Sequence, residues 1–272
     1  MSNKKKTLLF GIYGGAFGGF PPVFGIDKNY VDYFFKWGNV RMLSTLEDWE
    51  DQIEGVDVLV LPGGLDVDPQ RYGEKPHAQT SNPNVVHEYL DTTLLKYWLD
   101  NKKCIISICR GLQSLNISLG GSLVQHINGH VQKKDGGEPT EVMNTDIPGS
   151  KIVQVNTFHH QCIKKLAPEL EMIGWTFLSP KDVKQNRNKW DNFMHSWDFN
   201  KDTQRLEKSK DLYYAIPELV RGRTLPILGC QFHPEKIANG GCPFFTDLVN
   251  EFLKENFKDV ESIKEKVQET SK

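Results

Sequence analysis

Short apolar runs alternate with longer amphipathic segments along most of the chain. The apolar runs, several of them rich in β-branched residues, predict strands at residues 7–13, 40–43, 56–61, 104–108, 152–155, 170–177, 212–216 and 226–232. The amphipathic segments predict helices at residues 29–37, 85–101 and 243–257, and another directly after Cys109. This alternation favours an α/β fold with a doubly wound, mostly parallel sheet and helices on both faces.

Polar and glycine-rich segments separate these elements. Residues 14–27 and 65–84 are predicted to be loops, and residues 125–150 surface structure. Residues 1–260 are predicted to form a single domain, with an insertion at about 179–211 and a charged tail at 261–272. The aromatic side chains of the insertion are expected to pack on the domain, although covering the site or meeting a partner are alternatives.

Composition is that of an ordinary soluble protein: 272 residues, 38% hydrophobic and 25% charged, with a formal net charge of -2. Residues 4–6 form the one sizeable basic block, so neither nucleic acid nor a membrane is expected as a partner. The apolar run that follows is interrupted by glycines and prolines and lacks a cleavage site, so we interpret it as a buried strand rather than a leader. The five cysteines are scattered without a C-x-x-C pair, which favours a reduced, cytoplasmic setting.

Cys109 stands where the predicted strand 104–108 ends and a helix begins. Unpaired N–H groups at a helix N-terminus favour negative charge and stabilise a thiolate. Strained strand–turn–helix elbows of this kind present nucleophiles in hydrolases. A core cysteine beside a tight turn explains this stretch equally well when it is taken alone.

A base for such a thiol is found just after another buried strand, at His233. Glu235 lies two residues further on, so its carboxylate can reach back to orient the imidazole. The alternative is a surface H-x-E sequence with no partner. For the oxyanion of a tetrahedral intermediate, the expected donors are the backbone N–H groups of Arg110 and Gly64. Gly63-Gly64 alone would indicate only a tight turn.

No metal or cofactor is expected. The eight histidines and the acidic residues show no convincing ligand spacing, and neither G-x-G-x-x-G nor a P-loop occurs.

Taken together, these motifs resemble the class I glutamine amidotransferase superfamily. They are most similar to its γ-glutamyl-γ-aminobutyrate hydrolase-like branch, peptidase family C26. The motifs are residues 108–113 (ICRGLQ), 233–235 (HPE) and 62–64 (PGG), supported by 61–69 (LPGGLDVDP), 72–74 (YGE), 155–161 (VNTFHHQ) and 119–123 (LGGSL).

The resemblance implies a flavodoxin-like three-layer sandwich and a catalytic triad of Cys109, His233 and Glu235. It implies attack on a γ-glutamyl amide and a γ-glutamyl thioester that water resolves. It also implies that Gln113, His159 and His160 line the glutamyl pocket. Ser107 departs from the glycine usual before the nucleophile, and Lys210-Asp211 replaces a usual Asp-Gly pair.

Three functions follow as hypotheses. The first is a free-standing hydrolase of a small γ-glutamyl amine or amino acid. The second is a glutaminase that supplies ammonia to a separate synthetase partner. The third is a non-catalytic binding protein. The presence of all three triad residues argues against it. The sequence leaves the released amine and the oligomeric state open.

Overall fold

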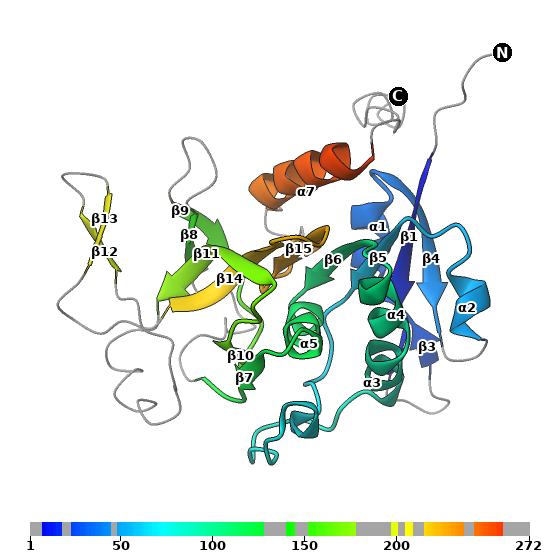
Figure 1. Ribbon diagram of the computed structural model, residues 1–272, viewed down its shortest axis with the longest axis horizontal. Helices are drawn as coiled ribbons and strands as arrows, with labels where there is room; N and C mark the ends of the chain where they lie inside the picture. Colours follow the sequence, from blue (N-terminus) through cyan, green and yellow to red (C-terminus); the bar gives the residue numbers. More distant parts are fainter. Residues whose placement is uncertain are drawn as a thin grey trace.

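The computed structural model describes residues 7–17, 23–44, 48–127, 140–144, 152–177, 197–200, 205–208, 215–236 and 242–257. Within these residues nine strands form one sheet in the order β4-β1-β5-β6-β15-β14-β11-β8-β9 (Figure 1). Their bounds are β1 Leu8–Tyr13, β4 Gly38–Leu43, β5 Val58–Leu61, β6 Cys104–Ile108, β8 Thr140–Asn144, β9 Ile152–Val155, β11 Leu170–Phe177, β14 Ala215–Gly222 and β15 Ile227–Cys230.

The first five strands in this order, from β4 to β15, are parallel, and the remaining pairings are antiparallel. Parallel strands place their carboxyl ends at one edge of the sheet. The segments that follow β1, β5, β6 and β15 are therefore neighbours in space although they are far apart in sequence.

Helices cover both faces of the sheet. They are α1 Lys28–Phe34, α2 Trp49–Gln52, α3 Val85–Thr92, α4 Leu94–Asp100, α5 Arg110–Ser118 and α7 Pro243–Asn256, with a 3-10 helix η1 at Pro69–Tyr72. Side chains of β5 show the division: Val58 and Val60 join the core beneath α1 and α7, while Leu59 and Leu61 join the core beneath α3, α4 and α5. The predicted flavodoxin-like α/β sandwich is confirmed.

Several predicted boundaries were wrong. The predicted loop 14–27 contains a hairpin, β2 Gly15–Phe17 with β3 Val23–Gly25, and the predicted surface segment 125–150 contains strand β8. The predicted helix 85–101 is divided at Thr93, which has φ -112° and ψ -76°. The strand predicted at 212–216 is described from Ala215 to Gly222.

Two further small sheets pair β7 Ser122–Val124 with β10 Cys162–Lys165, and β12 Trp197–Asn200 with β13 Arg205–Lys208. The second of these falls inside the predicted insertion at 179–211, most of which lies outside the described residues. The division into residues 1–260 and 261–272 stays a prediction.

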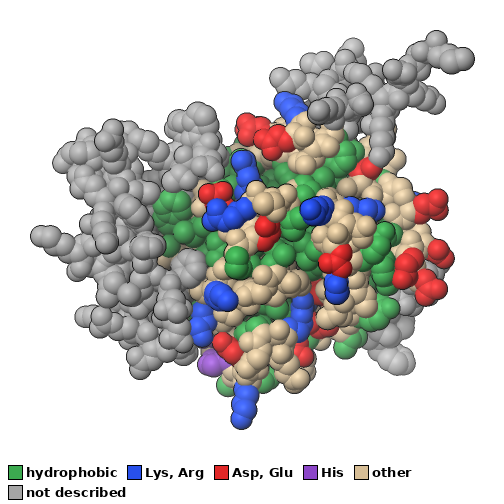
Figure 2. Space-filling model, in the orientation of Figure 1, with side chains coloured by type: hydrophobic (Ala, Val, Ile, Leu, Met, Phe, Trp, Pro, Cys, Tyr) green, Lys and Arg blue, Asp and Glu red, His purple; other side chains and the backbone are tan. Residues whose placement is uncertain are grey.

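Acidic and basic side chains are interspersed over the face seen in Figure 2, as the net charge of -2 suggests. Among the described helices, none is long and apolar enough to cross a bilayer.

Candidate active site

Cys109 occupies a strained elbow between β6 and α5, with φ 53° and ψ -111°. A positive φ at a residue other than glycine costs on the order of 1–3 kcal/mol and persists only where its surroundings enforce it. The Cys109 N–H donates to the Cys230 carbonyl at 2.8 Å. A Cβ on Gly111 would stand 2.1 Å from the Leu61 carbonyl, so this glycine lets α5 approach β5. The elbow is thereby fixed against two strands of the sheet.

His233 and Glu235 form a buried pair. The His233 Nδ1 lies 2.6 Å from Glu235 Oε1, and the two residues are 8% and 1% exposed. This contact leaves Nε2 as the ring nitrogen that can serve Cys109, whose side chain acts on the pKa of His233. Burial acts to lower the pKa of His233, but the side chains of Cys109 and Glu235 outweigh it and raise the pKa to about 10. The raised pKa favours the protonated imidazole at neutral pH.

Two further residues, neither of them predicted as a site residue, hold His233 in place. Asn156 Nδ2 donates to the His233 carbonyl at 2.8 Å, and the His233 N–H donates to Asn156 Oδ1 at 2.9 Å. The Tyr30 hydroxyl, on α1, lies 3.4 Å from His233 Nδ1. No sequence signal marked Tyr30, whereas Asn156 belongs to the 155–161 motif.

The turn after β5 faces the same imidazole. The Gly63 N–H donates to the Tyr30 hydroxyl at 2.8 Å, and a Cβ on Gly63 would stand 2.6 Å from His233 Cε1. Within the described residues the Gly64 N–H has no hydrogen-bond partner. Arg110 is the first residue of α5, where a backbone N–H has no intrahelical acceptor. The two predicted oxyanion donors thus flank the elbow, and their role stays a prediction.

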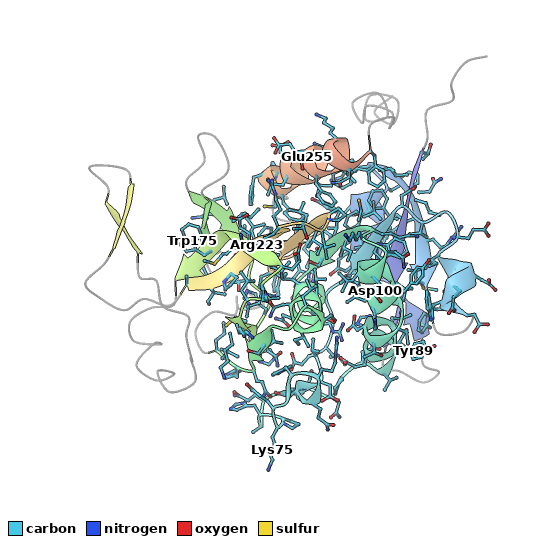
Figure 3. The ribbon with its side chains drawn as sticks, in the orientation of Figure 1. Lys75, Tyr89, Asp100, Trp175, Arg223 and Glu255 are labelled. Carbon is cyan, nitrogen blue, oxygen red and sulfur yellow. The ribbon has the colours of Figure 1, made fainter. Side chains whose placement is uncertain are left out.

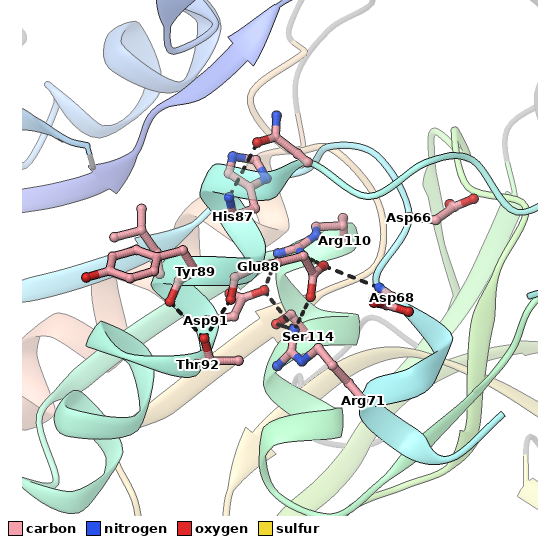
Figure 4. A network of polar contacts seen from close by, with 12 residues as sticks. Asp66, Asp68, Arg71, His87, Glu88, Tyr89, Asp91, Thr92, Arg110 and Ser114 are labelled. Carbon is pink, nitrogen blue, oxygen red and sulfur yellow. Dashed lines mark hydrogen bonds and ion pairs between the residues drawn. The ribbon is translucent and has the colours of Figure 1, made fainter. Parts of the chain in front are cut away.

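The Arg110 side chain, 2% exposed, joins a network with α3 (Figure 4). Its Nη1 lies 2.6 Å from Asp91 Oδ2 and its Nη2 lies 2.6 Å from Glu88 Oε1. Arg71 Nη1 contacts the same Asp91 oxygen at 2.9 Å and donates to the Ser114 hydroxyl at 3.0 Å. The carboxylates of Glu88 and Asp91 raise the pKa of Arg110 against the effect of burial. Sequence reasoning considered only the backbone of Arg110.

The three predicted substrate residues are placed differently. Gln113 Nε2 donates to the Gln161 carbonyl at 3.2 Å. His159 is buried and lies 3.5 Å from Glu218 Oε1, so its ring contacts strand β14. His160 Nε2 donates to Asp66 Oδ1 at 3.1 Å. This hydrogen bond raises the pKa of His160, against the effect of burial.

Amide groups without partners lie beside Gln113. Gln161 is 1% exposed, and neither atom of its side-chain amide has a hydrogen-bond partner among the described residues. The Gln231 Nε2 is likewise unpartnered there, and Gln113 Nε2 lies 3.3 Å from Gln231 Oε1. Unpaired buried polar groups are uncommon and call for water or a polar ligand.

A cavity of about 340 Å³ opens beside the imidazole. Its lining includes His233, Gly63, Gly64, Tyr30 and His87; Cys109, which is 6% exposed, is not among the described lining residues. In the described parts of the chain, no group of three His, Cys, Asp or Glu side chains is arranged to hold a metal ion. The cavity is therefore bordered by His233 and the glycine turn at residues 62–64, and the roles of nucleophile, proton carrier and oxyanion donors stay predictions.

Comparison with known proteins gives a consistent result. The family model of peptidase C26 matches residues 35–177. A Lactococcus lactis subsp. cremoris protein provisionally named glutamine amidotransferase-like protein YvdE homolog is 32% identical over 53% of this chain and 85% of its own length. The γ-glutamyl-γ-aminobutyrate hydrolase of Escherichia coli O157:H7 is 27% identical over 45% of this chain and 56% of its own length.

Among solved structures, a Thermoplasma acidophilum protein provisionally described as part of a GMP synthase matches with a TM-score of 0.56 and 15% identity. The match covers 92% of this chain and 94% of that one. At this identity the likeness concerns the fold.

Proposed function

Because this chain belongs to the peptidase C26 family, we propose that it hydrolyses a γ-glutamyl amide bond with Cys109 as nucleophile. The observation that carries the proposal is the buried pair of His233 and Glu235, with Nδ1 2.6 Å from Oε1, beside the strained elbow of Cys109, whose side chain acts on the pKa of His233. A thiol, an imidazole and a carboxylate in this order are the groups that covalent amide hydrolysis requires.

In the first half of the reaction, the Cys109 sulfur attacks the γ-carbonyl carbon and forms a C–S bond. The negative charge on the carbonyl oxygen is stabilised by the N–H groups of Gly64 and Arg110. The protonated His233 gives its proton to the leaving nitrogen as the C–N bond breaks, which leaves a γ-glutamyl thioester and a free amine.

In the second half, neutral His233 takes a proton from water while the water oxygen attacks the thioester carbon. The C–S bond breaks, glutamate leaves, and the thiolate–imidazolium pair is restored. Glu235 keeps the imidazole in one tautomer and stabilises its charged form in both halves.

The cavity beside His233 supports an organic amine as the leaving group. His233 must protonate the leaving nitrogen, so the space next to its ring receives the released part of the substrate. A volume of about 340 Å³ is near the lower end of small-molecule sites, which span roughly 300–1,000 Å³. Ammonia needs only the space of a water, about 30 Å³. Hydrolysis of a γ-glutamyl amine or amino acid is therefore our first choice.

The alternative is a glutaminase that passes ammonia to a separate synthetase. The likeness to the GMP synthase component of Thermoplasma acidophilum supports the fold only, so the choice rests on the cavity. A panel of γ-glutamyl amines, γ-glutamyl amino acids and glutamine distinguishes the two. We expect the amines or dipeptides to be cleaved by the isolated protein. Turnover of glutamine alone, and only after a synthetase is added, would contradict this choice.

A further inference from the structure

Helix α3 contacts the residues of both predicted oxyanion donors. Its His87 ring lies against Gly64, and its Glu88 and Asp91 carboxylates hold the side chain of Arg110. None of these three side chains has a step in the proposed reaction. Figure 4 shows them on one side of α3, facing Arg110 and the start of α5.

His87 fills the space that two glycines leave. A Cβ on Gly64 would stand 3.0 Å from both Cε1 and Nδ1 of His87, and a Cβ on Gly15 would stand 3.2 Å from Nε2. The residue is 5% exposed, and its Nδ1 has no hydrogen-bond partner among the described residues. Packing, rather than a hydrogen bond at Nδ1, therefore connects this ring to Gly64.

Arg110 is held by charge instead. Its two terminal nitrogens each lie 2.6 Å from a carboxylate of α3, and the Asp91 carboxylate is itself held by Arg71. Because the Arg110 side chain is buried and bound at both ends of its guanidinium, the first turn of α5 is fixed to α3. The Arg110 backbone N–H is fixed with it.

We propose that α3 is a brace that sets the spacing of the two oxyanion donors, with His87 as the positioning residue for Gly64. The inference rests on the proposed function, since the donors matter only where a tetrahedral oxyanion forms. Donors of this kind must hold their place to within about 0.5 Å to be effective. A rigid helix that contacts both donors supplies that constraint.

The charge state of His87 is compatible with this role. Burial and the Arg110 guanidinium lower its pKa to about 4, while Asp91 acts in the opposite direction. The ring is therefore neutral at neutral pH and can pack beside Arg110 without repulsion.

The test uses the full chain with γ-glutamyl-p-nitroanilide as the amide probe and iodoacetamide as a probe of Cys109. Alkylation needs the thiolate but no oxyanion donor. For His87→Ala we expect kcat to fall roughly 10- to 100-fold, somewhat less than outright removal of a donor. We expect KM to change less than about threefold, because the oxyanion develops only in the transition state, and alkylation of Cys109 to keep its wild-type rate.

Controls separate positioning from general damage. His87→Phe keeps a neutral planar ring and should recover most of kcat. Tyr89→Ala removes a 48% exposed side chain on the outer side of the same helix (Figure 3) and should change neither rate. If circular dichroism shows that His87→Ala does not fold, Glu88→Gln takes its place. This substitution weakens the contact with Arg110 without changing volume, and we expect the same fall in kcat with unchanged alkylation of Cys109.

Two outcomes overturn the brace. One is unchanged kcat in a folded His87→Ala or Glu88→Gln protein, and the other is a parallel loss of hydrolysis and alkylation. The wild type distinguishes this failure from that of the proposed function. If the wild type cleaves the probe and the variants cleave it equally well, only the proposed role of α3 is refuted. If the wild type neither cleaves the probe nor carries a Cys109 adduct, both the role of α3 and the proposed function are refuted.

Discussion

Two walls of polar side chains lie against the neighbours of Cys109, and they differ in the kind of polar group they hold: helix α3 contacts Arg110 through ion pairs, and residues 156–161 contact His233 and Gln113 through neutral groups. On the α3 wall, Arg110 and Arg71 Nη1 are ion-paired with Glu88 and Asp91 at 2.6–3.3 Å, while His87 Nδ1, Asp91 Oδ1 and Arg110 Nε have no partner among the described residues. On the opposite wall, built from residues 156–161 and their neighbours, the amide of Gln161 is buried without a partner among the described residues.

This difference indicates two tasks. A wall whose charged groups are paired with one another fixes backbone positions through that network. A wall with spare donors and acceptors can accept the polar groups of a glutamyl moiety or ordered water. We therefore assign support to the α3 wall and polar substrate contacts to the wall that contains Gln161.

The largest expected effect comes from breaking the α3 network. Asp91→Ala leaves two guanidinium groups with one carboxylate fewer in a buried site, which should lower the free energy of unfolding by about 3–5 kcal/mol. Asp100→Ala is the matched control, since its pair with Lys96 is 2.7 Å long but exposed and should contribute less than about 0.5 kcal/mol. Urea denaturation measures both. Equal losses in the two variants would show that the network has no special structural role.

A substitution on the wall that contains Gln161 should lower activity rather than stability. Gln161→Leu removes two unpartnered buried atoms, so the free energy of unfolding should stay level or rise by about 1 kcal/mol. If those atoms contact substrate or its water, kcat/KM should fall roughly 10- to 100-fold, the value of about 1–3 kcal/mol for a lost polar contact. Gln154→Leu, at an exposed position of β9, is the control. Loss of stability without loss of activity contradicts this assignment.

His87 and His233 should make opposite contributions to the pH dependence of stability. His87 has a pKa lowered to about 4 by burial and Arg110, whereas the side chains of Cys109 and Glu235 raise that of His233 to about 10, against burial. Between about pH 4 and 6.5 the unfolded chain binds the proton that folded His87 does not, so its contribution makes stability rise with pH.

Between about pH 6.5 and 10 the sign reverses, because folded His233 keeps a proton that the unfolded chain has released. Its stabilisation is complete below pH 6.5 and is lost as the pH rises to about 10. Nuclear magnetic resonance titration should find the two rings protonating near these values. His87→Gln should remove only the acid window and His233→Gln only the alkaline one. Two rings that both titrate near 6.5 would refute the comparison.

The smallest expected effect concerns the hydroxyl that joins the glycine turn to His233. Tyr30→Phe removes the acceptor of the Gly63 N–H and should lower kcat about fivefold, which corresponds to a hydrogen bond of about 1 kcal/mol. Tyr33→Phe removes a hydroxyl from the same helix that bonds Thr246 at 3.2 Å, and kcat should stay unchanged. A larger loss in Tyr33→Phe than in Tyr30→Phe would argue against the role of Tyr30.

The parallel half of the sheet was predictable because strands buried on both faces form continuous apolar runs, as β5 does. Cys109, His233 and Glu235 were accessible for the same reason, since each follows such a run. The antiparallel half was predicted less well, and the limits of β14 and the presence of β8 were missed.

The contacts that support the site could not be predicted from the sequence, because the residues that make them are far apart along the chain. Tyr30 and His233 are separated by 203 positions, and Asn156 and His233 by 77. The contacts of Arg110 with α3 depend on how two helices pack across β5, which no local pattern encodes. Sequence motifs therefore identified the groups proposed to react, while the groups that hold them emerged only from the folded chain.

The central claim is that Cys109 becomes acylated by a γ-glutamyl group. Rapid acid quenching of the protein with a γ-glutamyl substrate, followed by intact mass measurement and peptide mapping, tests it directly. We predict an added mass of one glutamyl group on the peptide that contains Cys109, and no adduct or turnover in Cys109→Ala. Undiminished turnover in Cys109→Ala, or an adduct confined to another cysteine, would contradict the account.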